Sequence, residues 1–597
     1  MLTGAGDDVG GEHADATALA PQATPAAEQA GPAAKQAGPA GQQAPAAGQP
    51  AELASAPRAW PAAADRGLPS GLALLTALAG GLVLAAAFPP VGAWPLAAVG
   101  PALLVVALWR RSLRGSLAVG LVFGLAFFVP LLAWLVNVAW YVWAALAVVE
   151  AVMFAVLTVG QRLLLNLRAW PLAAAGWWVA AEALRDRWPF GGFPWGRLAM
   201  SQASAPTAPW VAVGGAPLLT FLMALAGATL AWLVLGPARR EPPPARPAPG
   251  GGARTGRPRR RLGPAIAFAT AAGIAVGGAV LPVDHPGAGA QTATVAVVQG
   301  DVPHAGTLSG VLRATTVTAN HAAETRRLAA EVKDGSAPVP DVVIWPENST
   351  DLDPGLYPPV YATIAGAVDA INRPVLVGAV LDDPVRNAGQ LWLPGRGPVQ
   401  TYVKRQLVPF GEVIPFRSFL GKFTSLPSLQ PVNFTPGHRV VVFHHLGKIR
   451  LGDVICYEVG FDGLVRSEVT AGANLLVVQT NDADFEIDGQ TGETLQQLDI
   501  ARIRAMEHDR SVLVSSTTGV SAIIAPDGSL IAHSGIWRPA ILDARVPLRS
   551  SLTLADRVGG WPEYVITFLV LAALAWAIAG AAARSARSRR DGGPVRD

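Results

Sequence analysis

One stretch of the chain reads Gly452-Asp453-Val454-Ile455-Cys456-Tyr457-Glu458-Val459-Gly460. Its apolar first half is typical of a buried β-strand, and the polar turn that follows carries a carboxylate, Glu458, two positions after Cys456. Cys456 is the one cysteine among 597 residues, so no internal disulfide can form. Because a lone cysteine is commonly a small buried hydrophobe, its surroundings decide whether Cys456 has a chemical role.

The composition is that of a membrane protein. Hydrophobic residues make up 51% of the chain and charged residues 15%, and several long stretches carry almost no charge. About 20 apolar residues cross the hydrocarbon core of a bilayer. The number and length of these stretches argue against buried helices of a soluble protein. They predict a polytopic α-helical membrane domain of eight spans: 71–89, 92–108, 115–137, 141–161, 169–184, 209–235, 264–282 and 563–583.

The arginines of the loops predict the orientation of these spans, because cytoplasmic loops carry an excess of Lys and Arg. Basic residues follow spans two, four, six and eight: Arg110, Arg111, Arg114, Arg162, Arg168, the loop 238–262 and Arg584 to Arg590. Both termini are therefore expected in the cytoplasm and region 284–555 outside the cell membrane. Arg185, Arg187 and Arg197 are exceptions, since they fall in a loop predicted to lie outside.

Composition and spans together predict five parts of the chain. These are a disordered Ala/Pro/Gly-rich tail at 1–66, a membrane domain at 67–283 with spans one to seven and the basic cytoplasmic loop 238–262, an outer domain at 284–555, the last span within 556–583, and a basic cytoplasmic tail at 584–597. We interpret the basic loop as a solvated segment that faces anionic lipid.

The outer domain is predicted to be α/β. Short apolar runs, each typical of a buried strand, occur at 295–298, 342–345, 375–378, 440–443 and 475–478. Helical stretches at 308–333, 356–371, 461–472 and 491–509 fall between several of them. Strands that alternate with helices indicate sheets with covered faces.

Three polar residues follow strand-like runs in this domain. Glu347 comes after 342–346, Lys404 after Tyr402-Val403, and Cys456 after 449–455. Singly, Glu347 could cap a helix and Lys404 could be a solvated residue at a sheet edge. Together they supply a base for a thiol and a cation that favours a thiolate and a tetrahedral oxyanion. With no metal-ligand pattern and no Gly-rich phosphate loop in the sequence, we expect neither metal nor cofactor, and no nucleic-acid partner.

The contexts of these residues resemble a known family. Trp-Pro-Glu at 345–347, Lys-x-x-Leu-Val-Pro-Phe-Gly-Glu at 404–412 and Cys-Tyr-Glu at 456–458 are similar to the nitrilase (carbon–nitrogen hydrolase) superfamily. The apolar spans narrow the resemblance to its membrane-embedded branch, the apolipoprotein N-acyltransferases, over the chain from about residue 71 to the last span.

The resemblance implies a nitrilase-like α-β-β-α sandwich and an acyl transfer without cofactor. By it, Glu347 is the general base, Lys404 stabilises the oxyanion and thiolate, and Cys456 is the nucleophile. The implied partners are the lipid bilayer, a phospholipid acyl donor and diacylglyceryl-modified apolipoproteins, joined through a thioester on the enzyme. Three residues match supporting positions of the family: Glu412, Tyr457 and Glu458.

The chain departs from the family pattern in two places. No tryptophan follows Gln299-Gly300 near His304, and Ala483 rather than an aromatic residue follows Asn481-Asp482. These departures concern substrate contacts, for which Asn481 remains a candidate.

Other residues indicate a lipid substrate. The stretch from Phe410 to Leu426 mixes aromatic and basic residues and includes Phe416 and Phe419; it is either an arm in the headgroup region or a loop folded onto its own domain. Phe193, Trp195 and Trp210 fall where an outer aromatic belt is expected. Glu150, a carboxylate inside span four, is expected to face the bundle interior and is an unassigned candidate site.

Two other classes of protein stay open on the sequence alone. The first is a membrane-anchored amidase or nitrilase-type hydrolase that passes the acyl group of a small amide to water, although eight spans exceed what an anchor needs. The second is a transporter or receptor whose outer domain performs no catalysis, in which Cys456 would be dispensable.

Overall fold

A computed structural model describes residues 67–235, 262–281, 291–303, 310–422, 432–485 and 491–591. The predicted tail 1–66, the basic loop up to residue 261, His304 and residues 592–597 lie outside the described residues, as does Phe423 of the aromatic arm.

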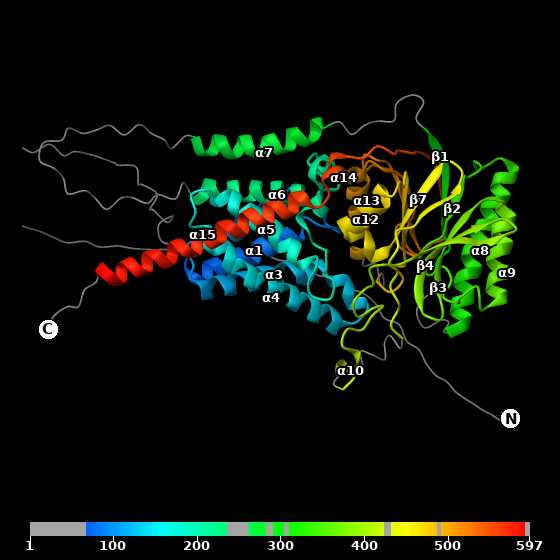
Figure 1. Cartoon of the computed structure of the whole chain (residues 1–597), viewed down its shortest axis with the longest axis horizontal. Helices are drawn as coiled ribbons and strands as arrows, with labels where there is room; N and C mark the ends of the chain where they lie inside the picture. The colour runs from blue at the N-terminus through cyan, green and yellow to red at the C-terminus, as the bar shows by residue number, and fades with distance from the viewer. Residues whose placement is uncertain are drawn as a thin grey trace, which may run out of the picture. The chain divides into compact units, whose positions relative to one another are not determined.

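Each of the eight predicted spans corresponds to an apolar helix (Figure 1): α1 Ser70–Ala85, α2 Leu96–Leu108, α3 Leu113–Leu131, α4 Trp140–Leu164, α5 Trp170–Arg185, α6 Val211–Leu235, α7 Leu262–Val280 and α15 Trp561–Asp591. Among the described residues, α3, α4, α6 and α15 are long and apolar enough to cross a membrane, while α1, α2 and the described part of α7 are shorter. The chain is therefore a membrane protein by length and composition of its helices.

Some predicted span boundaries are wrong. The third span was expected to continue to residue 137, but α3 ends at Leu131 and a 3₁₀ turn occupies Ala133–Asn137. Pro130 lies in the last turn of α3, and because it has no backbone N–H it weakens the continuation of the helix. The first span ends at Ala85, four residues before the expected 89, ahead of Pro89-Pro90.

The region predicted as the outer domain, which keeps that name below, contains two six-stranded sheets. The first has the order β12 Ala540–Pro547, β1 Thr292–Gln299, β2 Val342–Ile344, β3 Val375–Leu381, β4 Arg386–Leu393 and β5 Gly397–Val403. The second has the order β11 Leu530–His533, β10 Ala522–Ile524, β9 Val512–Ser516, β8 Leu475–Thr480, β7 Ile449–Ile455 and β6 Val442–Leu446. Strands β1, β2 and β3 run parallel, as do β7, β8 and β9, so their carboxyl ends lie at one edge of each sheet.

Helices cover the outer faces of the two sheets, which gives the α-β-β-α layering (Figure 1). Helices α8 Gly310–Asp334 and α9 Pro358–Ile371 pack on the first sheet, and α12 Asp462–Thr470 and α13 Gly492–His508 pack on the second. Val295 and Val297 of β1 point between the sheets, whereas Ala296 and Val298 point toward α8 and α9. Both faces of such strands are buried, which is why they read as continuous apolar runs.

The five predicted strand runs overlap β1, β2, β3, β6 and β8, and the four predicted helices overlap α8, α9, α12 and α13. The sequence interpretation missed β4 and β9 to β12. Strand β4 carries Arg386, Asn387 and Gln390, and β9 ends in two buried serines, so neither contains an apolar run of four residues like those of the predicted strands. Their strand state depends on pairing with neighbours rather than on local hydrophobicity.

Helix α13 also joins the outer domain to the membrane helices. Its residues Leu498 and Ile503 lie in the same apolar core as Phe127 of α3. The side-chain amide of Gln496 donates to the carbonyl oxygens of Pro89 (3.1 Å) and Leu131 (3.0 Å). The remaining short elements are α10 Arg417–Leu420, α14 Leu554–Val558 and the 3₁₀ turns Leu198–Gln202, Ala208–Trp210 and Cys456–Gly460.

Candidate active site

Each of the three predicted site residues follows the carboxyl end of a strand. Glu347 lies three residues after β2, Lys404 directly after β5 and Cys456 directly after β7. The structure brings them together because β2, β5 and β7 belong to two sheets packed face to face. Cys456 has a φ of +53°, a left-handed conformation that is rare for residues other than glycine. This strained turn holds the sulfur at the end of β7.

Lys404 lies between two carboxylates. Its Nζ is 3.0 Å from Oε1 of Glu347 and 3.0 Å from Oε1 of Glu412. The Asn387 side-chain amide donates to the same two oxygens, at 2.6 Å and 2.9 Å. Burial lowers the pKa of Lys404, but the charges of Glu347 and Glu412 outweigh it and raise that pKa well above its ordinary value. Lys404 is therefore an ammonium at neutral pH.

Glu347 is the candidate base. Its second oxygen, Oε2, accepts a 3.0 Å hydrogen bond from the backbone N–H of Asn481. Burial raises the pKa of Glu347, Lys404 opposes that rise, and Glu412 adds to it. A carboxylate with a raised pKa accepts a proton at neutral pH better than an ordinary glutamate does.

Cys456 is a thiol at rest. Only 9% of its surface is exposed. Burial and the charge of Glu347 raise the pKa of Cys456 well above its ordinary value, while Lys404 lowers it. Since the thiolate is the nucleophilic form of cysteine, this thiol needs a base that takes its proton during attack.

The sequence interpretation missed two residues beside the sulfur. Gln497 of α13 places its side-chain nitrogen 3.7 Å from Sγ of Cys456. The hydroxyl of Thr480, at the end of β8, also contacts Cys456 and lowers the pKa of the thiol. Nothing in the local sequence distinguishes Gln497 from Gln496 beside it, because only the packing of α13 on β7 and β8 decides which one faces the sulfur.

Glu458 and Glu412, predicted as supporting residues, hold backbone in place. Glu458 Oε2 accepts from the N–H of Ile455 (2.7 Å) and from the hydroxyl of Tyr402 (2.8 Å), and its Oε1 accepts from the N–H of Arg405 (2.6 Å). Glu458 thus ties the end of β7 to the segment that carries Lys404. Glu412 Oε2 accepts a 2.8 Å hydrogen bond from the N–H of Val408.

Tyr457 connects the nucleophile turn to the segment between α5 and α6. Its hydroxyl donates to the carbonyl oxygen of Gly192 at 2.7 Å, and its ring stacks on Trp195 (centroids 5.6 Å apart) and on Phe193 (6.3 Å). Trp195 is 3% exposed. A lipid-exposed aromatic belt therefore does not describe Trp195, because protein rather than lipid covers its ring.

The other candidates for lipid or substrate contact occupy different surroundings. Phe416 and Phe419 are 72% and 63% exposed, and Phe416 touches Phe190 edge to face. Trp210 is half-buried and donates its indole N–H to the carbonyl oxygen of Ile274 in α7. The side chain of Asn481 accepts a 2.7 Å hydrogen bond from Thr517.

Ion pairs explain the three arginines that contradict the charge rule for loops. Arg185 pairs with Glu150 at 2.5 Å, Arg187 with Glu563 at 2.6 Å, and Arg197 with Asp462 at 2.7 Å. Each positive charge is balanced by a carboxylate, so these arginines carry little orientation signal.

Glu150 faces the bundle interior as predicted. It is 2% exposed, and the guanidinium of its partner Arg185 also donates to the carbonyl oxygen of Trp195 at 2.9 Å. The buried ion pair thus fixes the backbone of the residue that stacks on Tyr457.

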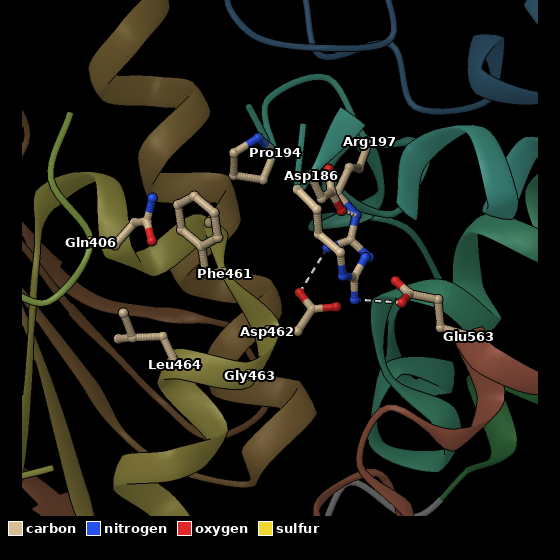
Figure 2. Close-up of a pocket in the computed structure, with 11 residues that line it drawn as sticks. Asp186, Pro194, Arg197, Gln406, Phe461, Asp462, Gly463, Leu464 and Glu563 are labelled. Atoms are coloured by element: carbon tan, nitrogen blue, oxygen red, sulfur yellow. Dashed lines mark hydrogen bonds and ion pairs between the residues drawn. The ribbon is translucent and has the colours of Figure 1, made fainter. Parts of the chain in front are cut away.

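A cavity of about 270 Å³ lies where the segment between α5 and α6 meets the start of α12 (Figure 2). Asp186, Pro194 and Arg197 line it from the membrane domain, and Phe461 and Asp462 line it from the outer domain. Its charges are paired with one another, so it is a polar junction between the two parts.

The two departures from the family pattern have different outcomes. His304 lies outside the described residues. Ala483 is buried beside Val302 and Val317, and the next aromatic residue, Phe485, packs edge to face on Trp134 of the membrane domain at 5.2 Å. In the part of the chain that the structure describes, no group of His, Cys, Asp and Glu side chains is arranged to hold a metal ion.

Two covered sheets with a glutamate, a lysine and a cysteine at their strand ends define the class as a carbon–nitrogen hydrolase domain, joined here to a bundle of apolar helices. Residues 294–551 match the family model described as "Carbon-nitrogen hydrolase", and residues 80–229 match "Apolipoprotein N-acyltransferase N-terminal domain".

Relatives that match most of the chain show which family it belongs to. The apolipoprotein N-acyltransferase of Mycolicibacterium smegmatis is 37% identical over 520 residues, which cover 84% of this chain and 84% of that protein. Those of Vibrio vulnificus and Azotobacter vinelandii are 26% and 28% identical and cover 83% and 84% of this chain and 95% and 94% of their own. The chain belongs to the apolipoprotein N-acyltransferase family.

Proposed function

We propose that this enzyme transfers an acyl chain from a membrane phospholipid to the α-amino group of the diacylglyceryl-cysteine at the N-terminus of bacterial lipoproteins. One observation carries the proposal: the turn that holds Cys456 beside the Glu347–Lys404 pair is bonded through Tyr457 to the membrane domain. Such a site lets a thiol react with a carbonyl that arrives from a bilayer. The family relationship supports the same activity.

In the first step, Glu347 accepts the thiol proton as the sulfur of Cys456 attacks an ester carbonyl of the phospholipid. The carbon–sulfur bond forms, the carbon–oxygen bond of the ester breaks, and Glu347 returns the proton to the departing lysophospholipid oxygen. The Lys404 ammonium stabilises the oxyanion of the tetrahedral intermediate.

In the second step, the lipoprotein α-amine attacks the thioester carbonyl. The carbon–nitrogen bond forms, the carbon–sulfur bond breaks, and the Cys456 sulfur leaves as a thiolate. Glu347 takes the proton lost by the amine and passes it to the sulfur. A thioester keeps enough acyl-transfer potential to make an amide without ATP, so the residues present suffice for both steps.

We also propose that all eight apolar helices cross the cell membrane, with 1–66 and 584–597 cytoplasmic and 284–555 outside. Exposed aromatic residues support this placement: Trp140, Trp188 and Trp561 lie at the ends of α4, α5 and α15 that adjoin the outer domain. Arg110 and Arg168 lie at the opposite ends of neighbouring helices. The exposed Phe416 and Phe419 would then enter the headgroup region beside the outer leaflet.

The test of the proposed function uses intact-protein mass. Wild-type protein incubated with phospholipid vesicles should gain the mass of one acyl chain, which hydroxylamine removes and which Cys456→Ser does not acquire. Addition of a diacylglyceryl-cysteine peptide should transfer that chain to the peptide amine. Release of the acyl group to water alone, or turnover of small amides without any phospholipid adduct, would favour the amidase alternative and reject the proposal.

A further inference from the structure

Helix α13 places the side-chain amide of Gln497 beside the sulfur of the candidate nucleophile. The Nε2 atom of Gln497 lies 3.7 Å from Sγ of Cys456, a separation at which an N–H donates weakly to sulfur. Gln497 is 2% exposed, so water does not compete for this amide. The amide is therefore a donor held at the reacting atom.

Glu493, one turn earlier on α13, sets the orientation of that amide. Its Oε1 accepts from Nε2 of Gln497 at 3.4 Å. The same Gln497 nitrogen contacts both Glu493 and the sulfur, so the amide oxygen, on the other side of the amide carbon, is turned away from them. The flip of the amide that would turn its oxygen toward Sγ is disfavoured by Glu493.

The charged groups around the sulfur of Cys456 give the thiolate little net stabilisation, so a further hydrogen-bond donor would add to it. Glu347 faces Cys456 from the end of β2, Lys404 from the end of β5, and Glu493 from α13, while the hydroxyl of Thr480 faces it from β8. The two carboxylates disfavour a thiolate. Lys404 favours it, but its Nζ is shared with Glu347 and Glu412 at 3.0 Å each. A neutral N–H aimed at the sulfur adds thiolate stabilisation without adding charge.

We propose that Gln497 is a catalytic residue: its side-chain N–H donates to the sulfur of Cys456 and stabilises the thiolate when it attacks and when it leaves. The inference rests on the proposed function for the identity of the acyl groups but concerns the thiol itself. In the attack the proton of Cys456 goes to Glu347 and the sulfur electron pair forms the bond to carbon. In the second step the same pair returns to sulfur, and the Gln497 N–H again meets a developing negative charge.

Two substitutions separate this role from packing. Gln497→Met keeps the length of the side chain and removes the donor, and Gln497→Glu replaces the donor by an acceptor. Gln496→Met is the matched control, because Gln496 has similar burial, occupies the adjacent position on α13, and directs its amide to Pro89 and Leu131 rather than to sulfur.

The measurement is alkylation of the full-length protein by iodoacetamide across a pH series, followed by intact mass. Cys456 is the one cysteine, so each added carbamidomethyl group reports on it. We expect Gln497→Met to alkylate about 10-fold more slowly at neutral pH, as a loss of about 1.4 kcal/mol of thiolate stabilisation implies, with the profile moved to higher pH. Gln497→Glu should move the pH profile of alkylation further in the same direction. The profile of Gln496→Met should coincide with that of the wild type.

An unchanged pH profile in Gln497→Met, with a thermal transition like that of the wild type, would overturn the inference. If Gln497→Met lacks that transition, Gln497→Asn decides, since its shorter side chain withdraws the amide from the sulfur with a smaller change in packing; a wild-type profile in this variant likewise overturns it. Alkylation needs no acyl donor. A shifted profile together with no phospholipid adduct would therefore reject the proposed function and leave the role of Gln497 standing.

Discussion

The hydroxyl of Tyr457 donates a 2.7 Å hydrogen bond to the carbonyl oxygen of Gly192. Tyr457 directly follows the candidate nucleophile, and Gly192 belongs to the segment after α5. Because Cys456 has a left-handed backbone, the position of its sulfur depends on what holds the next residue. Through this bond the membrane domain takes part in fixing the nucleophile turn.

Tyr457→Phe should therefore slow thioester formation about 5-fold while it retains the stack on Trp195. The variant loses one buried hydrogen bond, worth about 1 kcal/mol, and leaves the Gly192 oxygen without its donor. Adduct formation with phospholipid, followed by intact mass, checks this. Tyr141→Phe, at a partly exposed site on α4, is the control; equal rates in all three proteins would show that the bond does not position the sulfur.

Lys404→Met should abolish adduct formation and lower stability. It leaves Glu347 and Glu412 facing each other without their shared cation, and removal of one partner of a buried ion pair costs about 3–5 kcal/mol. Thermal unfolding in detergent and intact mass measure both effects. Lys422→Met removes a lysine from an exposed position and should change neither. An active Lys404→Met would contradict the assigned role.

The rate of thioester formation should fall on the acid side at a pH above the ordinary pKa of glutamate, about 4.3. Burial raises the pKa of Glu347, and the role proposed for Glu347 requires its ionised form, because only a carboxylate can accept the thiol proton. The rate therefore drops as pH decreases through the raised pKa, and Glu347→Gln should lose the activity at every pH. A pH–rate profile of adduct formation tests this; an acid limb that persists in active Glu347→Gln would assign it to another group.

Asp453→Asn should stabilise the protein at neutral pH. Asp453 is fully buried on β7, and neither of its carboxyl oxygens has a hydrogen-bond partner within the described residues. Burial, with Glu458, Glu468 and Glu347 adding to it, raises the pKa of Asp453 well above its ordinary value. The folded state then holds a proton that the unfolded state releases, so this residue costs stability as pH rises above about 4.

The expected gain is more than about 1 kcal/mol at pH 7, and it should shrink as pH falls toward 4. Thermal unfolding of Asp453→Asn and wild type across this pH range measures it. Asp543→Asn, at an exposed position on β12, should show no such difference. A lower melting temperature for Asp453→Asn at pH 7 would show instead that the carboxyl group is needed for packing.

Local pattern was sufficient for much of the architecture. Lengths of apolar sequence predicted the eight helices, because a buried or lipid-facing helix needs a continuous apolar surface. The positions of Glu347, Lys404 and Cys456 at strand ends also followed from local sequence, since each comes within three residues of a run that forms a strand. The resemblance of these contexts to the carbon–nitrogen hydrolases then supplied their order and proposed roles.

Contacts between distant residues could not be derived in this way. Asn387 meets Glu347 because β4 pairs with β3, which lies beside β2, and Gln497 meets Cys456 because α13 packs on the second sheet. Trp195 is an aromatic residue at a position where an outer aromatic belt is expected, yet the stack on Tyr457 buries it. Arg185 at the end of α5 and the two arginines after it pair with carboxylates in the fold, so they likewise carry little orientation signal.

The apolar helices, the main buried strands and the candidate nucleophile at the end of one strand can be read from the amino-acid sequence, because each depends on hydrophobicity and order along the chain. Which polar side chains surround the sulfur of Cys456, and that Tyr457 bonds to the membrane domain, follows from the folded structure alone. Those contacts join residues far apart in sequence, and packing of sheets and helices, not local pattern, brings them within hydrogen-bond distance.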